Sequence, residues 1–113
     1  MKVLTIEERF YCDELKITGK VDLIIDSPMG AIIIDYKTSY KPSKTWPIQG
    51  SAYAYLARKA GYSIAGIQFV HLNKHGMKPD LYDYPDKFDV FRKCLDVYDY
   101  FFRSTRGTKS KST

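Results

Sequence analysis

Alternating apolar and polar side chains over the first third of the chain predict paired β-strands. Residues 3–10 alternate loosely and indicate a first strand. The next strand has one apolar face, made by the odd-numbered residues Leu15, Ile17, Val21, Leu23 and Ile25, with Ile24 among the polar residues of the other parity. Residues 27–30 (SPMG) favour a tight turn, and the β-branched residues 31–37 predict the partner strand. We therefore expect a β-hairpin.

The next segments predict a helix followed by a buried strand. Residues 38–45 read as a polar loop, and Pro47 suits the first turn of a helix that runs to about Lys59. Gly61 is well placed to end this helix. Residues 64–72 predict a strand buried on both faces, and the helical crossover that precedes it favours a parallel arrangement with its neighbour.

The last third predicts a turn, a short strand and a second helix. Residues 73–76 form the turn, and 77–84 hold the short edge strand. Asp86 can cap a last helix whose apolar stripe is Phe88, Phe91, Leu95, Tyr98 and Phe102. The order β-β-β-α-β-(β)-α predicts an α/β fold with a mixed sheet. We expect one domain over residues 1–102 and a basic tail over 103–113.

Composition fits a single soluble domain and excludes several classes of protein. The 113 residues are 44% hydrophobic and 27% charged, with no apolar run long enough to span a membrane and no signal-peptide core at the start. The two cysteines, Cys12 and Cys94, are too few for a disulfide framework or a cysteine-rich metal cluster. These features favour the reducing cytoplasm as its location.

Charge is concentrated at the C-terminal end. The formal net charge is +5, and the basic residues of 103–113 are Arg103, Arg106, Lys109 and Lys111, with no acidic residue among them. The rest of the chain is close to neutral. This end is either a solvated tail or an arm that follows a phosphate backbone.

The hairpin brings two carboxylates and a lysine together. If the loop is residues 27–30, Asp26 faces Ala31, and the same register places Asp22 opposite Asp35. Lys37 projects from the same face, two residues beyond Asp35. Carboxylates about 4 Å apart repel by about 4 kcal/mol at an effective dielectric constant near 20, and a divalent cation would neutralise both. The alternative is that both aspartates face solvent separately and Lys37 only offsets their charge.

Three short motifs around this hairpin resemble those of one nuclease group. Gln49 and Tyr53, four residues apart on one helix face, match the Gln-x-x-x-Tyr signature of RecB-like nucleases. Residues 19–24 (GKVDLI) are similar to the Gly-x-x-Asp strand of that branch, and residues 33–39 (IIDYKTS) to its Asp-Tyr-Lys-Thr motif. The resemblance covers about residues 7–72. It identifies the chain as a member of the PD-(D/E)XK superfamily with a minimal restriction-endonuclease-like core.

The resemblance implies a role for each matching residue. Asp22 and Asp35 would ligate Mg²⁺ or Mn²⁺, with the backbone carbonyl of Tyr36 as a further ligand. Lys37 would orient the attacking water or stabilise charge in the transition state. Gln49 and Tyr53 would position the metal site or the DNA backbone.

One departure from the family concerns the third acidic ligand. Relatives carry a helix before the first strand that often supplies it, whereas this chain begins almost at the strand. Glu8 is the best substitute, with Glu7 behind it. A homo-oligomer or a partner chain that supplies the helix would also complete the site. Some members of this branch hold an iron–sulfur cluster on four cysteines, and two cysteines cannot supply one.

The functional expectation is a metal-dependent deoxyribonuclease that acts as an exonuclease on DNA ends. An endonuclease acting on branched or single-stranded DNA is the enzymatic alternative, and an inactive nucleic-acid-binding protein is the alternative from another class. Candidate nucleic-acid contacts are Lys41 and Lys44, in a loop flanked by Tyr40 and Trp46, together with Arg103 and Arg106. His71 favours a packing role.

Overall fold

Five strands and two helices make up the computed structural model, which describes residues 2–38, 43–72, 80–83 and 86–103. The strands are β1 (Lys2–Cys12), β2 (Ile17–Ser27), β3 (Gly30–Lys37), β4 (Ile64–His71) and β5 (Asp80–Asp83), and the helices are α1 (Thr45–Lys59) and α2 (Phe88–Phe102). The element order is the one that the sequence predicts.

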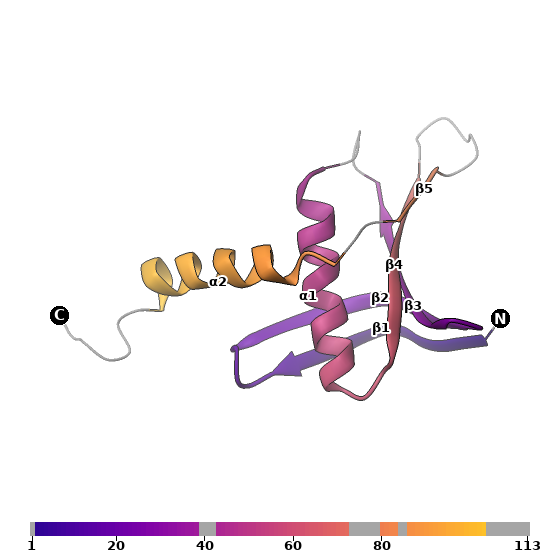
Figure 1. The fold of residues 1–113 in the computed structure, drawn as a ribbon, viewed down its shortest axis with the longest axis horizontal. Coiled ribbons are helices and arrows are strands. Elements are labelled where there is room, and N and C mark those ends of the chain that lie inside the picture. Colours follow the sequence, from indigo (N-terminus) through magenta and orange to yellow (C-terminus); the bar gives the residue numbers. More distant parts are fainter. Residues whose placement is uncertain (1, 39–42, 73–79, 84–85, 104–113) are drawn as a thin grey trace.

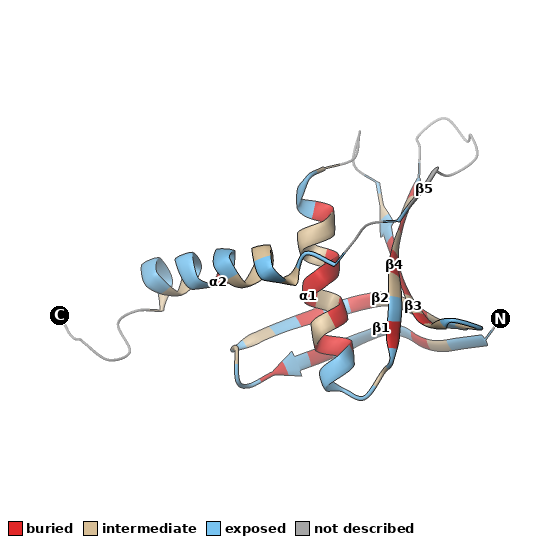
Figure 2. Cartoon of the chain, in the orientation of Figure 1, coloured by how far each residue is buried: buried red, intermediate tan, exposed pale blue. Residues whose placement is uncertain are grey.

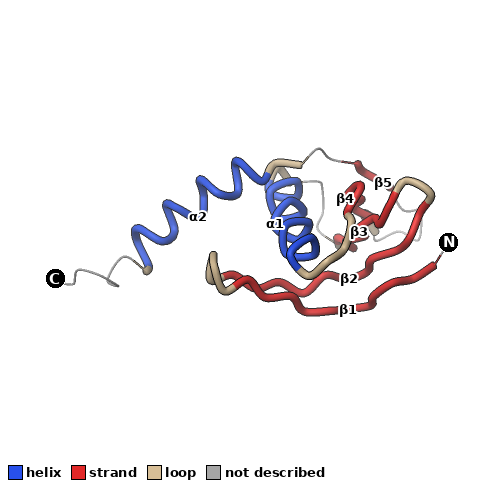
Figure 3. Tube along the Cα trace, turned by 60° about the horizontal axis from the view of Figure 1, so that its bottom comes forward, coloured by secondary structure: helices blue, strands red, loops and turns tan. Residues whose placement is uncertain are grey.

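The strands form one mixed sheet in the order β1-β2-β3-β4-β5. Neighbouring strands are antiparallel except β3 and β4, which are parallel and joined through α1. The α/β fold with a mixed sheet is therefore confirmed. Helix α1 lies across the sheet, and α2 projects beyond it toward the end of the β1–β2 hairpin (Figures 1 and 3).

The core lies between α1 and the sheet face that it covers (Figure 2). Its fully buried side chains include Val21, Ile24, Ile33 and Phe69 of the strands and Ala54 and Ala57 of the helix. Gly50 allows close approach of α1 to β4, because a Cβ there would lie only 2.8 Å from Ile67 Cγ2. Trp46, 4% exposed, stacks on Phe69 with ring centroids 5.5 Å apart.

Two predictions about the strands were wrong. In β4, Ile67, Phe69 and His71 are buried, whereas the alternate residues Gly66, Gln68 and Val70 are only half-buried, so burial is complete on one face only. The reason is that α1 covers a single face of the sheet. In β2, the buried positions change parity, from Val21 to Ile24, so the odd-numbered residues do not form one continuous inner face.

An irregularity in β1 accompanies this change of parity. The β1–β2 register shifts between Val3 and Thr5, and Glu7 has a φ of 49°, which is uncommon for a residue other than glycine. Glu7 falls between the pairs Ile6–Leu23 and Glu8–Val21, which places it opposite Asp22. The unusual backbone conformation of β1 therefore lies directly opposite a candidate site residue.

Helix α2 is fixed at both ends but is mostly exposed. Asp86 Oδ1 accepts a hydrogen bond from the Phe88 amide at 2.9 Å, and the Lys87 amide donates to the Ser51 hydroxyl of α1. At the other end, Arg103 donates to the carbonyls of Leu15 and Lys16 at 3.1 and 2.7 Å. The predicted apolar stripe is only partly used in packing, because Leu95 is its one buried member. Neither α1 nor α2 is long and apolar enough to cross a bilayer.

Candidate active site

The β2–β3 turn sets the register of the candidate site. Asp26 pairs with Ala31, as predicted, and the ladder continues to Leu23 and Ile34. Ser27 also pairs with Gly30, so the turn is tighter than the predicted loop of residues 27–30. The Ser27 hydroxyl donates to the Gly30 carbonyl at 2.6 Å, and Gly30 has a φ of 123°, which glycine adopts without strain. One step beyond Leu23 and Ile34, this register sets Asp22 opposite Asp35.

The Asp22 side chain contacts β3 just beyond Leu23 and Ile34, the last paired residues of β2 and β3. Its Oδ2 accepts a hydrogen bond from the Tyr36 amide at 3.0 Å, so a carboxylate takes the place of a backbone acceptor there. This contact holds the Asp22 carboxyl group beside the backbone of the residue that follows Asp35. The two aspartates are therefore neighbours across the strands.

Asp35 is a buried carboxylate with a cation against it. It is 4% exposed, and Lys37 Nζ lies 2.8 Å from its Oδ2. Burial raises the pKa of Asp35 to about 6, against the opposing effect of Lys37, and the nearby Asp22 carboxyl raises it further. A cation bound beside Asp22 and Asp35, in addition to Lys37, would lower the pKa of Asp35 and favour its ionised form.

Lys37 also links the strands to α1. Its ammonium donates to Gln49 Oε1, and Gln49 Nε2 donates to the Tyr53 hydroxyl at 2.9 Å. Burial and the charge of Asp35 raise the pKa of Tyr53, which keeps its hydroxyl protonated. Asp35, Lys37, Gln49 and Tyr53 thus form one continuous polar chain, as their spacing in the sequence suggests.

Gly19 makes room for the Tyr53 ring. A Cβ at Gly19 would lie 2.9 Å from Tyr53 Cε1 and 3.1 Å from Leu56 Cδ1. The glycine that precedes Asp22 by three residues therefore has a packing reason: it lets the Tyr53 ring of α1 lie directly against β2.

The donors gathered here suit a hard divalent cation. Asp22 and Asp35 supply carboxylate oxygens, and the carbonyl of Tyr36 lies in the same strand segment. Within the described residues, no group of three His, Cys, Asp or Glu side chains is placed to hold a metal. A bound ion would therefore complete its coordination with carbonyl groups, water or substrate oxygens.

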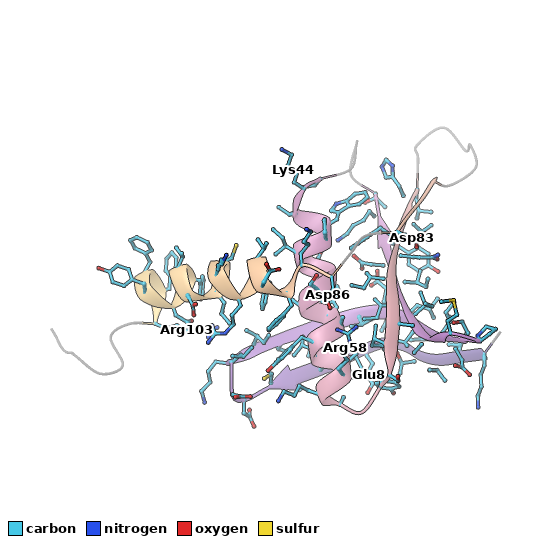
Figure 4. All side chains as sticks on the ribbon, in the orientation of Figure 1. Glu8, Lys44, Arg58, Asp83, Asp86 and Arg103 are labelled. Carbon is cyan, nitrogen blue, oxygen red and sulfur yellow. The ribbon has the colours of Figure 1, made fainter. Side chains whose placement is uncertain are left out.

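The structure does not bring Glu8 into this cluster. Glu8 is exposed and pairs with Val21 (its side chain is labelled in Figure 4). Glu7, by contrast, lines a hollow of about 450 Å³ with Asp22 and Tyr36, although its carboxylate also lies 3.3 Å from Lys20 Nζ. Of the two glutamates, Glu7 is therefore nearer to the candidate site.

Comparison with known proteins shows the family of this chain. A sequence model of the PD-(D/E)XK nuclease superfamily matches residues 1–106. The chain belongs to this superfamily. Its members are nucleases that generally use divalent metals, which agrees with the oxygen donors of Asp22 and Asp35. A comparison with curated proteins found no match.

Two solved structures share the PD-(D/E)XK fold of this chain. The crystal structure of SSO0001 is 19% identical, with a TM-score of 0.58 over 86% of this chain and 50% of that one. A structure described as a "putative exonuclease" from Eubacterium rectale is 14% identical, with a TM-score of 0.53 over 88% of this chain and 43% of that one. The chain spans half or less of the length of these structures, and at these identities the likeness shows the fold.

Of the four basic residues expected to contact nucleic acid, two lie within the described residues. Lys41 and Arg106 lie outside the described residues. Lys44 is exposed just before α1 and points away from the sheet (Figure 4). Trp46 is buried in the core, so it does not flank the loop as an exposed ring. Arg103 binds the turn between β1 and β2, which gives it a structural role that the sequence did not predict.

The remaining residues considered in the sequence are His71 and the two cysteines. His71 is 6% exposed and contacts Trp46 edge-on, with ring centroids 5.7 Å apart, in agreement with a packing role. Cys12 is buried, whereas Cys94 is exposed on α2 rather than packed within its apolar stripe.

Proposed function

We propose that this chain is a RecB-like, metal-dependent deoxyribonuclease that hydrolyses phosphodiester bonds at DNA ends. The observation that carries the proposal is the position of Lys37, whose ammonium touches buried Asp35 on one side and Gln49 of α1 on the other. A buried acid, a second acid beside it and a fixed cation form a charge arrangement suited to phosphoryl transfer.

Each side chain has a distinct task in this proposal. Asp22 and Asp35, with the Tyr36 carbonyl, would hold Mg²⁺ or Mn²⁺. When bound, the metal polarises the phosphoryl oxygen and lowers the pKa of its water. Lys37 faces the negative charge that develops on the phosphoryl group, and Gln49 keeps its ammonium in place. Tyr53 positions Gln49, so its effect on catalysis is indirect.

Action on ends is supported by one comparison. A neighbour with the same fold is described as a putative exonuclease. A second candidate, a nucleic-acid-binding protein without activity, is favoured by a different observation: the described residues offer two acidic ligands rather than three. The two candidates differ in whether Lys37 is needed for function.

A cleavage assay tests the proposal. End-labelled linear DNA, single- and double-stranded, and closed circular DNA are incubated with the full chain in Mg²⁺, Mn²⁺ or EDTA. Lys37→Ala is the test variant, and Lys59→Ala, at an exposed lysine near the end of α1, is the matched control. We expect metal-dependent loss of linear DNA with the wild type and Lys59→Ala only, while the circle survives.

Other outcomes would overturn specific parts of the proposal. Cleavage of the circle would refute the end-dependent mode, and full activity of Lys37→Ala would refute the assigned role of Lys37. Binding of DNA with no cleavage in either metal would favour the inactive binding protein.

A further inference from the structure

Helix α2 exposes an apolar surface that the rest of the chain does not cover. Val97, Tyr98, Phe101 and Phe102 are 57%, 47%, 69% and 72% exposed. Within the described residues, α2 packs on α1 and reaches the β1–β2 turn only through Arg103. Contiguous exposed apolar surface of this kind marks interaction sites in soluble proteins.

The exposed surface is a stripe separate from the one that contacts α1. Val90, Cys94, Val97 and Phe101 follow one another at intervals of four, three and four residues, the spacing of a coiled-coil seam. Leu95, the buried residue, lies about 100° away from Cys94 around the helix. We call these four residues the α2 seam.

We propose that the α2 seam binds the α2 seam of a second copy of this chain, with the two helices antiparallel. In this pairing Val90 packs against Phe101 of the partner subunit, and Cys94 packs against Val97 of the partner subunit. Every contact of the seam then joins two apolar side chains. Two-fold symmetry produces each contact twice.

The charges beside the seam favour this direction. In the antiparallel pairing, Lys93 of one helix comes within about one turn of Asp96 of the partner subunit, and symmetry repeats the attraction. In a parallel pairing, the flank of the seam that holds Lys93 and Asp96 would face the opposite flank of the partner helix, so the attraction between Lys93 and the partner's Asp96 would be lost.

The surface available is suited to a concentration-dependent dimer. A buried aromatic side chain covers about 150–250 Å², so the exposed parts of the seam and its neighbours Tyr98 and Phe102 offer roughly 400–500 Å² per copy. Two copies would bury about 900 Å², below the roughly 1,200 Å² at which specific interfaces begin. We therefore expect association at high micromolar concentration.

The partner would lie close to the candidate active site. Cys94 and Tyr98 line a groove of about 630 Å³ beneath α2, and Gln49 and Tyr53 line the same groove. A second α2 on the seam would run along the rim of this groove. The dimer does not depend on the proposed nuclease function, because it rests on surface residues outside the acidic cluster.

Sedimentation velocity over about 10–500 µM protein provides the first test, because an association of this strength changes the mean mass over that range. Phe101→Glu and Tyr100→Glu form a matched pair, since the two neighbours are 69% and 70% exposed and only Phe101 belongs to the seam. We expect dimerisation of the wild type and of Tyr100→Glu, and loss of the dimer in Phe101→Glu. A wild type that stays monomeric throughout, or equal behaviour of the two variants, would overturn the proposal.

Disulfide trapping tests the direction of the helices. Val97→Cys places a thiol opposite the native Cys94 of the partner subunit, while Tyr100→Cys places one about 100° around the helix from Phe101, outside the seam. Cys12 is buried. Diamide oxidises each pair of thiols to a disulfide and is itself reduced. We expect Val97→Cys to form far more covalent dimer than Tyr100→Cys or the wild type on a non-reducing gel. Equal trapping in all three would refute the antiparallel register.

Discussion

Replacing Asp35 by Asn should make the metal-free protein more stable while removing its activity. Burial raises the pKa of Asp35 from 3.8 to about 6, so the folded state holds its proton more tightly than the unfolded state does. As pH rises from 3.8 to 6, the unfolded state loses this proton first, and the free energy of unfolding falls. The shift corresponds to a loss of about 3 kcal/mol, fully developed above pH 6.

The Asn side chain has the shape of the protonated acid and avoids this cost. Because the pKa of about 6 already includes the attraction of Lys37, we expect a net gain of up to about 3 kcal/mol at pH 8, vanishing well below pH 3.8. Urea unfolding in EDTA at both pH values measures it. Adding Mn²⁺ should then stabilise the wild type but not Asp35→Asn.

Two results would refute this reasoning. If Asp35→Asn were less stable than the wild type at pH 8 in EDTA, the carboxylate would be a net stabilising group and its burial would be compensated by Lys37. If Mn²⁺ stabilised both proteins equally, the ion would bind somewhere other than Asp35.

Three further substitutions test packing and hydrogen bonds around the site. Gly50→Ala should lower the free energy of unfolding by about 1–2 kcal/mol, since crowding against Phe69 outweighs the gain in helix propensity, and thermal unfolding measures it. Ser51→Ala should cost about 1–3 kcal/mol and speed hydrogen exchange in α2, because the Lys87 amide loses its acceptor. Tyr53→Phe should slow DNA cleavage about fivefold, the worth of one hydrogen bond, with metal affinity unchanged by calorimetry.

The acidic pair could be predicted because it depends on local rules. A two-residue turn and an alternating pattern determine the register of β2 on β3, and that register alone sets Asp22 opposite Asp35. Gln49 and Tyr53 likewise share a helix face because they are four residues apart. Parity, turn length and helical period are all readable in the chain.

Features that depend on the surroundings could not be predicted in this way. An amphipathic pattern shows that α2 has an apolar stripe but not which part of it is covered. Phe102 and Leu95 therefore look alike in the sequence, yet Phe102 is 72% exposed and Leu95 is 6% exposed. Trp46 follows a basic loop, yet Phe69 and His71 bury it. The positive φ of Glu7 has no signal in the sequence, because glutamate has no preference for the left-handed region.

The β2–β3 turn has a consequence for insertions and deletions. Met29 at its tip is 85% exposed, and such loop tips usually accept added or lost residues. Here, one residue gained or lost would shift the pairing and rotate Asp22 or Asp35 to the opposite face, about 20 Å from the change. The turn should therefore tolerate substitution of Met29 but not a change in length. A length variant could keep its solubility and its core and still lose the acidic pair.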